Sequence, residues 1–346
     1  MSQTLRCDEN FYLAGHEDAE KLFLSAYNAG SLHHGWIVSG IEGIGKATLC
    51  YKIARFLLSA EAGKKYDKLD ISPESAVAAQ VAQRSHPDFK VLERDFIETD
   101  KKKLIKAIKD NDDGIDALKQ GLKRSSVIKV EDVRDVVAFL MKKSFNDCWR
   151  VVIVDSADDL NVSSANALLK ILEEPPAKSI LLLISHNPGR LLPTIRSRCA
   201  TLALKPLNEQ TVASLLRRYR PELKEAEVGK LAKISGGSIG RALSYYDNGA
   251  LEMYEKIKKA AIEGKRCSGA ALLDLADDAI ASEESWALFF ELVARVIREI
   301  LPESGAFREM YAAYEEILKI FDETERLNME RREAALMIIS KVSGAC

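Results

Sequence analysis

The pattern of apolar and polar positions changes character near residue 205. Before that point, short continuous apolar runs at 36–39, 151–155 and 179–185 alternate with stretches at 46–60, 131–143 and 163–174, where apolar residues recur every three or four positions. Continuous runs of this length are typical of buried strands, and the three-to-four spacing is typical of amphipathic helices. Strands that alternate with helices predict an α/β domain with a mostly parallel sheet.

The pattern is weaker between residues 61 and 126. A helix is expected near 15–30 and a short extended segment at 128–130, whereas Ser72-Pro73 and His86-Pro87 indicate turns and an insertion near 95–125. The insertion holds the densest basic run of the chain (Lys101, Lys102, Lys103, Lys106, Lys109). Acidic residues follow it at once (Asp110, Asp112, Asp113). We interpret this run as a solvated helix face rather than as a contact to a DNA backbone.

Past Leu204 only helical patterns remain, and Lys205-Pro206 marks a boundary. Helices are expected at 208–219 and 225–234, with Gly236-Gly237 ending the second, and further ones from 240, at 286–301 and at 307–320. The sequence therefore predicts three domains: an α/β core at 1–205, a small helical domain at 206–250 and an all-helical domain at 251–346.

Length and charge add limits to this picture. A chain of 346 residues exceeds the size at which a single core keeps growing. With 50 basic and 52 acidic residues the net charge is −2, so any nucleic-acid contact must come from local patches. No apolar run approaches the roughly 20 residues that span a membrane, and no leader-like segment is visible, so we expect a soluble, cytoplasmic protein.

The six cysteines are scattered along the chain. None forms a C-x-x-C pair or has a histidine at ligand spacing (Cys7, Cys50, Cys148, Cys199, Cys267, Cys346). We therefore expect neither a zinc module nor disulfide bonds, and interpret these thiols as small apolar or incidental residues.

The chemistry-bearing motif is the loop Gly40-Ile41-Glu42-Gly43-Ile44-Gly45-Lys46-Ala47, which follows the first strand and opens a helix. Glycines let backbone N–H groups turn toward phosphate oxygens, the helix adds its positive N-terminal end, and Lys46 can reach the terminal phosphates. Ala47 stands where a Ser or Thr hydroxyl normally binds Mg²⁺, and Thr48 is one residue out of register.

A second gap follows the strand at 151–155. This strand ends in Asp155, as a strand that delivers a carboxylate to a Mg²⁺ shell would, but the next residue is Ser156 instead of the Glu that polarises water in ATPases. A missing general base typically lowers the rate by about 10²–10⁴. The two gaps predict a nucleotide site that does not hydrolyse ATP by itself, and they leave ATP or ADP binding open.

These motifs resemble those of bacterial clamp-loader AAA+ subunits. The resemblance rests on the phosphate loop, the strand ending in Asp155, the segment Asn166-Ala167-Leu168-Leu169-Lys170-Ile171-Leu172-Glu173-Glu174-Pro175-Pro176, the segment 185–188, and Ile195-Arg196-Ser197-Arg198-Cys199. A defective nucleotide site beside an intact Ser-Arg-Cys motif is most similar to the delta-prime subunits of DNA polymerase III. The stretch 324–332 is similar to the end of their collar domain.

The resemblance implies roles for individual residues. Arg198 would be an arginine finger that acts in trans on ATP held by a neighbouring subunit, with Arg196 as the alternative. Ser185 and Asn187 would lie at the position that senses the γ-phosphate. Arg241, at the start of a helix of the small lid domain, would either lean toward nucleotide or serve domain packing.

The resemblance also implies a setting. This chain would be a stator in a heteropentameric ring with gamma/tau and delta subunits, and the ring would load a sliding clamp onto primer-template DNA during replication. The chain would belong to a polymerase holoenzyme but would itself have neither ATPase nor polymerase activity. Two alternatives remain open: a self-sufficient gamma/tau-like ATPase, and an adaptor that uses neither Lys46 nor Arg198.

Overall fold

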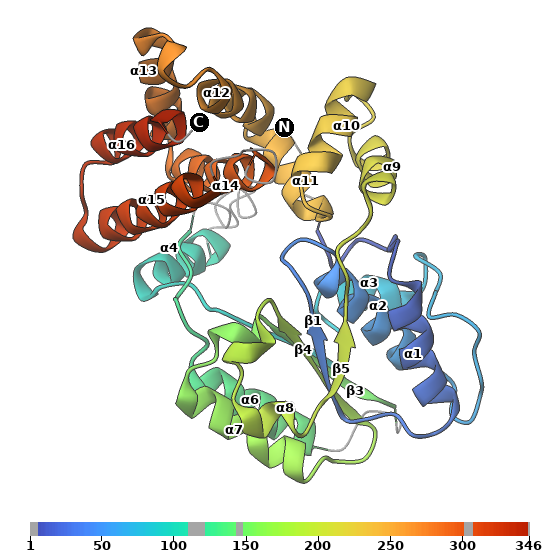
Figure 1. The fold of residues 1–346 in the computed structure, drawn as a ribbon. Helices are drawn as coiled ribbons and strands as arrows, with labels where there is room; N and C mark the ends of the chain where they lie inside the picture. Colours follow the sequence, from blue (N-terminus) through green and yellow to red (C-terminus); the bar gives the residue numbers. More distant parts are fainter. Residues whose placement is uncertain (1–5, 110–121, 143–147, 301–306, 345–346) are drawn as a thin grey trace. The chain divides into compact units, whose positions relative to one another are not determined.

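The computed structural model describes residues 6–109, 122–142, 148–300 and 307–344, and the chain divides into two compact units, Met1–Asn208 and Glu209–Cys346 (Figure 1). The first unit is built on a five-stranded sheet with the order β2-β3-β4-β1-β5, in which every pairing is parallel. The strands are β1 (Gly35–Ser39), β2 (Phe89–Glu93), β3 (Arg150–Asp155), β4 (Ser179–Ser185) and β5 (Ala200–Ala203). The predicted α/β fold with a mostly parallel sheet is confirmed.

Helices cover both faces of this sheet (Figure 1). One face carries α1 (Glu17–Asn28), α2 (Lys46–Ser59) and α3 (Ala76–Ala82), and the other carries α6 (Val130–Met141), α7 (Val162–Glu173) and α8 (Pro193–Arg196). Successive residues of a strand point to opposite faces. In β3, Val151 and Ile153 accordingly join the core under α2, while Val152 and Val154 join the core under α7.

Several elements of this unit differ from the sequence expectation. The strands β2 and β5 and the helices α3 and α4 (Glu98–Lys109) were not expected as separate elements. The extended segment predicted at 128–130 is reduced to an isolated bridge between Ile128 and Leu160, because α6 already begins at Val130. The basic run lies on α4, where Lys101 pairs with Asp95 and Lys103 pairs with Asp100. The acidic residues Asp110, Asp112 and Asp113 lie outside the described residues.

The second unit is built from helices. Its helices are α9 (Glu209–Tyr219), α10 (Glu225–Ile234), α11 (Ile239–Asp247), α12 (Ala250–Glu263), α13 (Gly269–Ala279), α14 (Glu283–Ile300), α15 (Phe307–Leu327) and α16 (Arg331–Gly344). Fully buried side chains such as Phe289, Leu292 and Ile338 form its interior. The predicted change to an all-helical region is confirmed, and a finer division near residue 250 stays a prediction.

None of the helices in the described part of the chain combines the length and apolar character that crossing a membrane requires.

Candidate functional site

The phosphate loop connects β1 to α2 at the carboxyl edge of the sheet. Gly40, Gly43 and Gly45 adopt φ values of +146°, +75° and +105°, which side chains rarely tolerate. At Gly40 a Cβ atom would lie 2.7 Å from the carbonyl oxygen of Leu204, so only glycine lets the loop pass so close to the end of β5. The backbone is therefore shaped as a cradle in which N–H groups and the start of α2 can meet an anion.

Lys46 is folded back onto this loop. Its ammonium donates to the carbonyl oxygens of Gly40 and Ile41, each at 2.7 Å, and only 3 % of the residue is exposed. Burial lowers the pKa of Lys46 to about 8, although the carboxylates of Glu42 and Asp155 oppose this shift. Within the described part of the chain, no carboxylate lies at hydrogen-bond distance from this desolvated ammonium, and a phosphate group would supply an anionic partner.

The sheet brings Lys46 and Asp155 to the same edge. Asp155 ends β3, and burial raises its pKa, with the neighbouring Glu93 carboxylate adding to the effect. The methyl group of Ala47 packs against the apolar core, and Thr48 is buried in the first turn of α2. The loop therefore fits the phosphates of a nucleotide, whereas the hydroxyl that would bind Mg²⁺ beside Asp155 is replaced by a core methyl group.

Asp158, which sequence reasoning did not single out, organises the end of β4. Its carboxylate accepts hydrogen bonds from Ser185 Oγ at 2.8 Å, His186 N at 2.5 Å and Ser156 Oγ at 3.0 Å, and a longer one from Asn187 N at 3.4 Å. Burial opposes ionisation of Asp158, but these hydrogen bonds outweigh it and hold its pKa below the usual value. The sequence signal that could have indicated Asp158 is its position three residues after Asp155, where β3 ends.

The two predicted sensing residues differ in accessibility. Ser185 is fully buried and donates to Asp158, whereas Asn187 is exposed and its side-chain oxygen accepts from Gly189 N at 3.2 Å. Ser185 ends β4 beside β1, where it is paired in register with Ser39, and Asn187 follows two residues later. The structure therefore places them at the same edge of the sheet as the phosphate loop.

A segment before α1 also supports the loop, and sequence reasoning missed it. The ring of His16 is 4 % exposed and its Nε2 lies 2.7 Å from the carbonyl oxygen of Ile44. A Cβ atom on Gly45 would lie 2.9 Å from Leu13 Cδ1, so Leu13 packs closely against the loop. The loop is thus held from outside as well as by Lys46.

Arg198 lies in the turn between α8 and β5. Its guanidinium pairs with Glu173 Oε1 at 3.0 Å, donates to the carbonyl oxygen of Thr194 at 3.1 Å and retains 37 % side-chain exposure. The next residue, Cys199, anchors the turn against β1: its Sγ lies 2.9 Å from the place where a Gly35 Cβ would be, and burial raises its pKa to about 12. Arg196 at the end of α8 is exposed.

Arg198 and the phosphate loop occupy opposite edges of the same sheet. The carbonyl group of Arg198 lies beside Gly35, where β1 begins, whereas Gly40 follows the other end of that strand. Five residues of extended chain at about 3.3 Å each separate these ends by roughly 16 Å. Arg198 therefore faces away from the loop of its own chain.

Arg241 belongs to the second unit. Its Nε lies 2.6 Å from Glu291 Oε1, and its Nη1 donates to the carbonyl oxygen of Ser235 at 3.3 Å. Both contacts lie within that unit, and the choice between a packing role and a nucleotide-sensing role for Arg241 stays a prediction.

Comparison with known proteins identifies the family. The model of a family described as DNA polymerase III, delta subunit matches residues 15–208. The DNA polymerase III subunit delta-prime of Pseudomonas aeruginosa is 32 % identical over 65 % of this chain and 59 % of the relative. The Escherichia coli subunit of the same name is 30 % identical over 70 % of this chain and 63 % of the relative. The matched segment thus spans about three fifths of these relatives.

Other known proteins are similar to this chain at lower identity. A gamma/tau subunit of DNA polymerase III from Mycobacterium tuberculosis is 28 % identical over 80 % of this chain and 43 % of the relative. A solved gamma subunit-related protein from Thermotoga maritima is 19 % identical, with a TM-score of 0.39, over 93 % of this chain and 99 % of that one. Because the family model covers more than half of its residues, this chain belongs to the DNA polymerase III delta-subunit family, as a delta-prime-like member of the clamp-loader AAA+ proteins.

Proposed function

We propose that this chain is a clamp-loader subunit that completes the ATPase site of a neighbouring subunit with Arg198 and does not hydrolyse ATP itself. The observation that carries the proposal is the placement of Arg198. A partly exposed guanidinium lies at the sheet edge opposite to its own phosphate loop, which supports a contact with a phosphate group outside this chain.

The contacts of Arg198 suit such a role. A surface ion pair such as the one with Glu173 is typically worth about 0–1 kcal/mol, so a polyphosphate can displace the carboxylate at little cost. The planar guanidinium then offers two parallel donors to phosphate oxygens, and a finger of this kind contributes about 10³–10⁵ in rate. Anchoring by Cys199 keeps the turn in place while the guanidinium changes partners.

The phosphate loop of this chain is better suited to binding a nucleotide than to hydrolysing it. Lys46 and the loop N–H groups would hold the phosphates of ATP or ADP, which supply the anion that the desolvated ammonium lacks. Ala47 offers no oxygen to Mg²⁺, and Ser156, which donates to Asp158, is no base for water. A bound nucleotide would therefore stabilise the fold of this unit rather than be turned over.

The partners follow from the family. Gamma/tau subunits are among the relatives, and a subunit of that kind would bind the ATP that Arg198 contacts. Together with a delta subunit they would open a sliding clamp and place it on primer-template DNA in the cytoplasm. The polymerase chemistry would belong to other subunits of the holoenzyme.

The test is clamp- and DNA-stimulated ATP hydrolysis by the reconstituted loader. Arg198→Ala should lower the rate by at least about tenfold without preventing assembly, given the usual contribution of such a finger. Arg196→Ala, two residues away at the exposed end of α8, is the matched control and should leave the rate within about twofold. Equal effects of both variants, or none, would refute the trans role of Arg198.

A self-sufficient ATPase is the second candidate, favoured by the intact cradle with Gly45 and Lys46. It is tested with the chain alone. Magnesium-dependent turnover that disappears in Lys46→Ala would establish this candidate, whereas a silent wild-type chain would eliminate it.

A further inference from the structure

Helix α14 presents an alternating row of charges to the α9–α11 group of helices. Glu291, Arg295 and Glu299 are four residues apart, and residues at this spacing lie along one face of a helix. All three contact residues of α10, α11 or the turn between them. The contacts lie entirely within the second unit.

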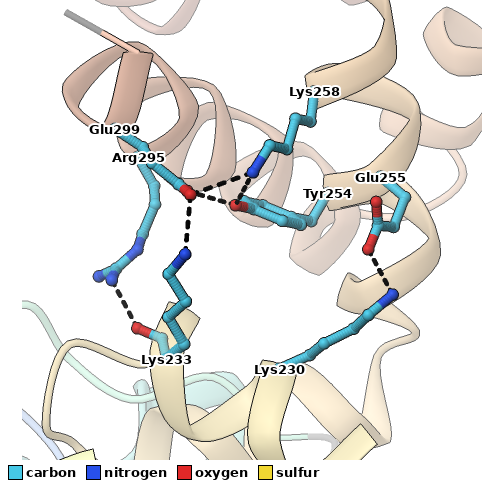
Figure 2. Close-up of polar contacts among 7 residues, drawn as sticks. All are labelled: Lys230, Lys233, Tyr254, Glu255, Lys258, Arg295 and Glu299. Atoms are coloured by element: carbon cyan, nitrogen blue, oxygen red, sulfur yellow. Dashed lines mark hydrogen bonds and ion pairs between the residues drawn. The ribbon is translucent and has the colours of Figure 1, made fainter. Parts of the chain in front are cut away.

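Glu299 gathers three donors from two other helices (Figure 2). Lys233 of α10 lies at 3.1 Å, Lys258 of α12 lies at 3.0 Å, and the hydroxyl of Tyr254, also on α12, donates to the second carboxylate oxygen. Burial opposes ionisation of Glu299, but these donors outweigh it and lower its pKa to about 2. A single carboxylate thus ties α10 and α12 to α14.

Arg295 binds the carboxyl-terminal end of α10. Its Nη2 donates to the carbonyl oxygen of Lys233 at 2.6 Å, a carbonyl in the last turn of that helix (Figure 2). Its Nη1 lies 3.0 Å from where a Cβ atom on Gly236 would be, and Arg241 Nη1 lies 3.7 Å from the same point. The two guanidiniums therefore lie against the glycine turn, which has a φ of +63° and where a Cβ atom would crowd Arg295.

Glu291, the first residue of the row on α14, contacts α11. It pairs with Arg241 at 2.6 Å, and its charge acts on Tyr245, a residue that is 2 % exposed. Burial and the Glu291 carboxylate both raise the pKa of Tyr245, so the phenol stays protonated. A second contact between α10 and α12, from Lys230 to Glu255 at 2.6 Å, lies to one side of the row (Figure 2).

We propose that this row is a clasp, formed by Glu291, Arg295 and Glu299 with Arg241, Lys233, Tyr254 and Lys258, which fixes the α9–α11 group in one orientation on α12 and α14. Arg241 is then a positioning residue of the clasp. The proposal is independent of nucleotide binding and of Arg198, because every contact that carries it lies in residues 209–346.

The arrangement exceeds a set of unrelated surface pairs in two ways. Isolated exposed pairs contribute little, but charges that share partners support one another. The clasp also fixes direction, because α10 is held at its carboxyl end, α11 near its start, and both against the same side of α14. Loss of one end should let the α9–α11 group open while its own fold persists.

The test is amide hydrogen exchange in the full-length protein. In the double variant Glu291→Gln with Glu299→Gln, exchange in residues 209–247 should quicken by on the order of tenfold, while exchange in residues 6–109 stays unchanged. Glu252→Gln is the matched control. Glu252 is a more exposed carboxylate on α12, and its pair with Lys256 lies within the same helix, so this variant should change nothing.

A charge exchange separates the clasp from general packing. Arg241→Glu alone should quicken exchange, and Arg241→Glu combined with Glu291→Arg should restore most of the protection. Unchanged exchange in the double glutamine variant, an equal effect of Glu252→Gln, or no recovery on charge exchange would each overturn the proposal. Circular dichroism of each variant shows whether helix content is retained, so that unfolding is not mistaken for opening.

Discussion

A single carboxylate, Asp158, holds the end of β4 beside the phosphate loop, and its removal should be measurable. Asp158→Asn keeps the shape but replaces one acceptor oxygen by a donor that faces Ser185 Oγ or His186 N. We expect a loss of roughly 2 kcal/mol in the free energy of unfolding, measured with urea, because a donor that bonds to the carboxylate is left unpaired.

The adjacent residue provides the control for Asp158. Asp159→Asn makes the same chemical change at a carboxylate that pairs with Arg94 on the surface, so it should cost less than about 1 kcal/mol. The pKa of Asp158 lies below its usual 3.8, so its contribution is present above about pH 4 and disappears as the pH falls. Equal costs for the two variants at pH 7 would contradict the role of Asp158.

The lowered pKa of Lys46 predicts a pH-dependent nucleotide affinity. A bound phosphate stabilises the ammonium and raises its pKa above the value of about 8 in the nucleotide-free protein. The affinity for nucleotide is therefore highest below pH 8, where the ammonium is charged, and falls as the pH rises. Calorimetric affinity for ADP should fall by about tenfold between pH 7.5 and pH 9.

A variant that cannot lose its charge tests this explanation. Lys46→Arg retains a positive charge throughout this range, so its affinity should be nearly constant between pH 7.5 and pH 9. A wild-type affinity that is also constant would show that Lys46 does not contact the phosphates. An absence of ADP binding at pH 7.5 would contradict the nucleotide site itself.

Sequence reasoning located site residues that belong to motifs and missed those that act through folding. Lys46 and Asp155 were found because each follows a recognisable strand, and the sheet does bring their edge positions together. Asp158 and His16 were missed because the hydrogen bonds that tie Asp158 to the end of β4 and His16 to the loop join residues 27 to 29 and 28 positions apart in the chain. No local pattern specifies a contact across that distance.

At the scale of elements, burial decided which ones could be predicted. The strands β3 and β4 lie inside the sheet and form continuous apolar runs, so both were expected with nearly correct bounds. The edge strands β2 and β5 are short and mix buried with exposed positions, as in Phe89–Glu93. A pattern of this kind over four or five residues is not distinguishable from a loop.

The connection from β1 to α2 depends on Gly40, a position where a side chain would collide with its neighbours. In Gly40→Ala, the new Cβ would lie 2.5 Å from Ile44 Cδ1 and 2.7 Å from the carbonyl oxygen of Leu204, at a φ of +146°. We expect a loss of roughly 3 kcal/mol in the free energy of unfolding, together with weaker ADP binding, from backbone strain and the close contact.

Gly63 separates strain from crowding. It also has a positive φ, +77°, but no atom lies within 4 Å of its added Cβ. Gly63→Ala should therefore cost only about 1 kcal/mol and leave ADP binding intact. If chemical denaturation gives the same loss for both variants, the close approach of Gly40 to β5 is not what shapes the loop.

At the scale of the whole molecule, the chain is two units with separate interiors. The sheet and its helices enclose the two apolar layers of residues 1–208, whereas Trp286, Phe289 and Ile338 belong to the interior of residues 209–346. The change of hydrophobic pattern near Leu204 and Lys205 lies within a few residues of this division. The change of pattern is visible in the sequence because each unit has its own class of secondary structure, while the predicted three-domain division stays a prediction.

Separate interiors predict that residues 209–346 fold without the rest of the chain. Expressed alone, this segment should be helical and unfold cooperatively in a calorimeter, with an enthalpy near 100 kcal/mol at roughly 0.7 kcal/mol per residue. Its clasp should persist, so Glu291→Gln with Glu299→Gln should quicken exchange in 209–247 by the same factor as in the full chain. Residues 1–208 alone should keep the pH-dependent ADP affinity, since Lys46 and its loop lie wholly within them. A broad, non-cooperative transition of the isolated helical segment would mean that its interior depends on the first unit.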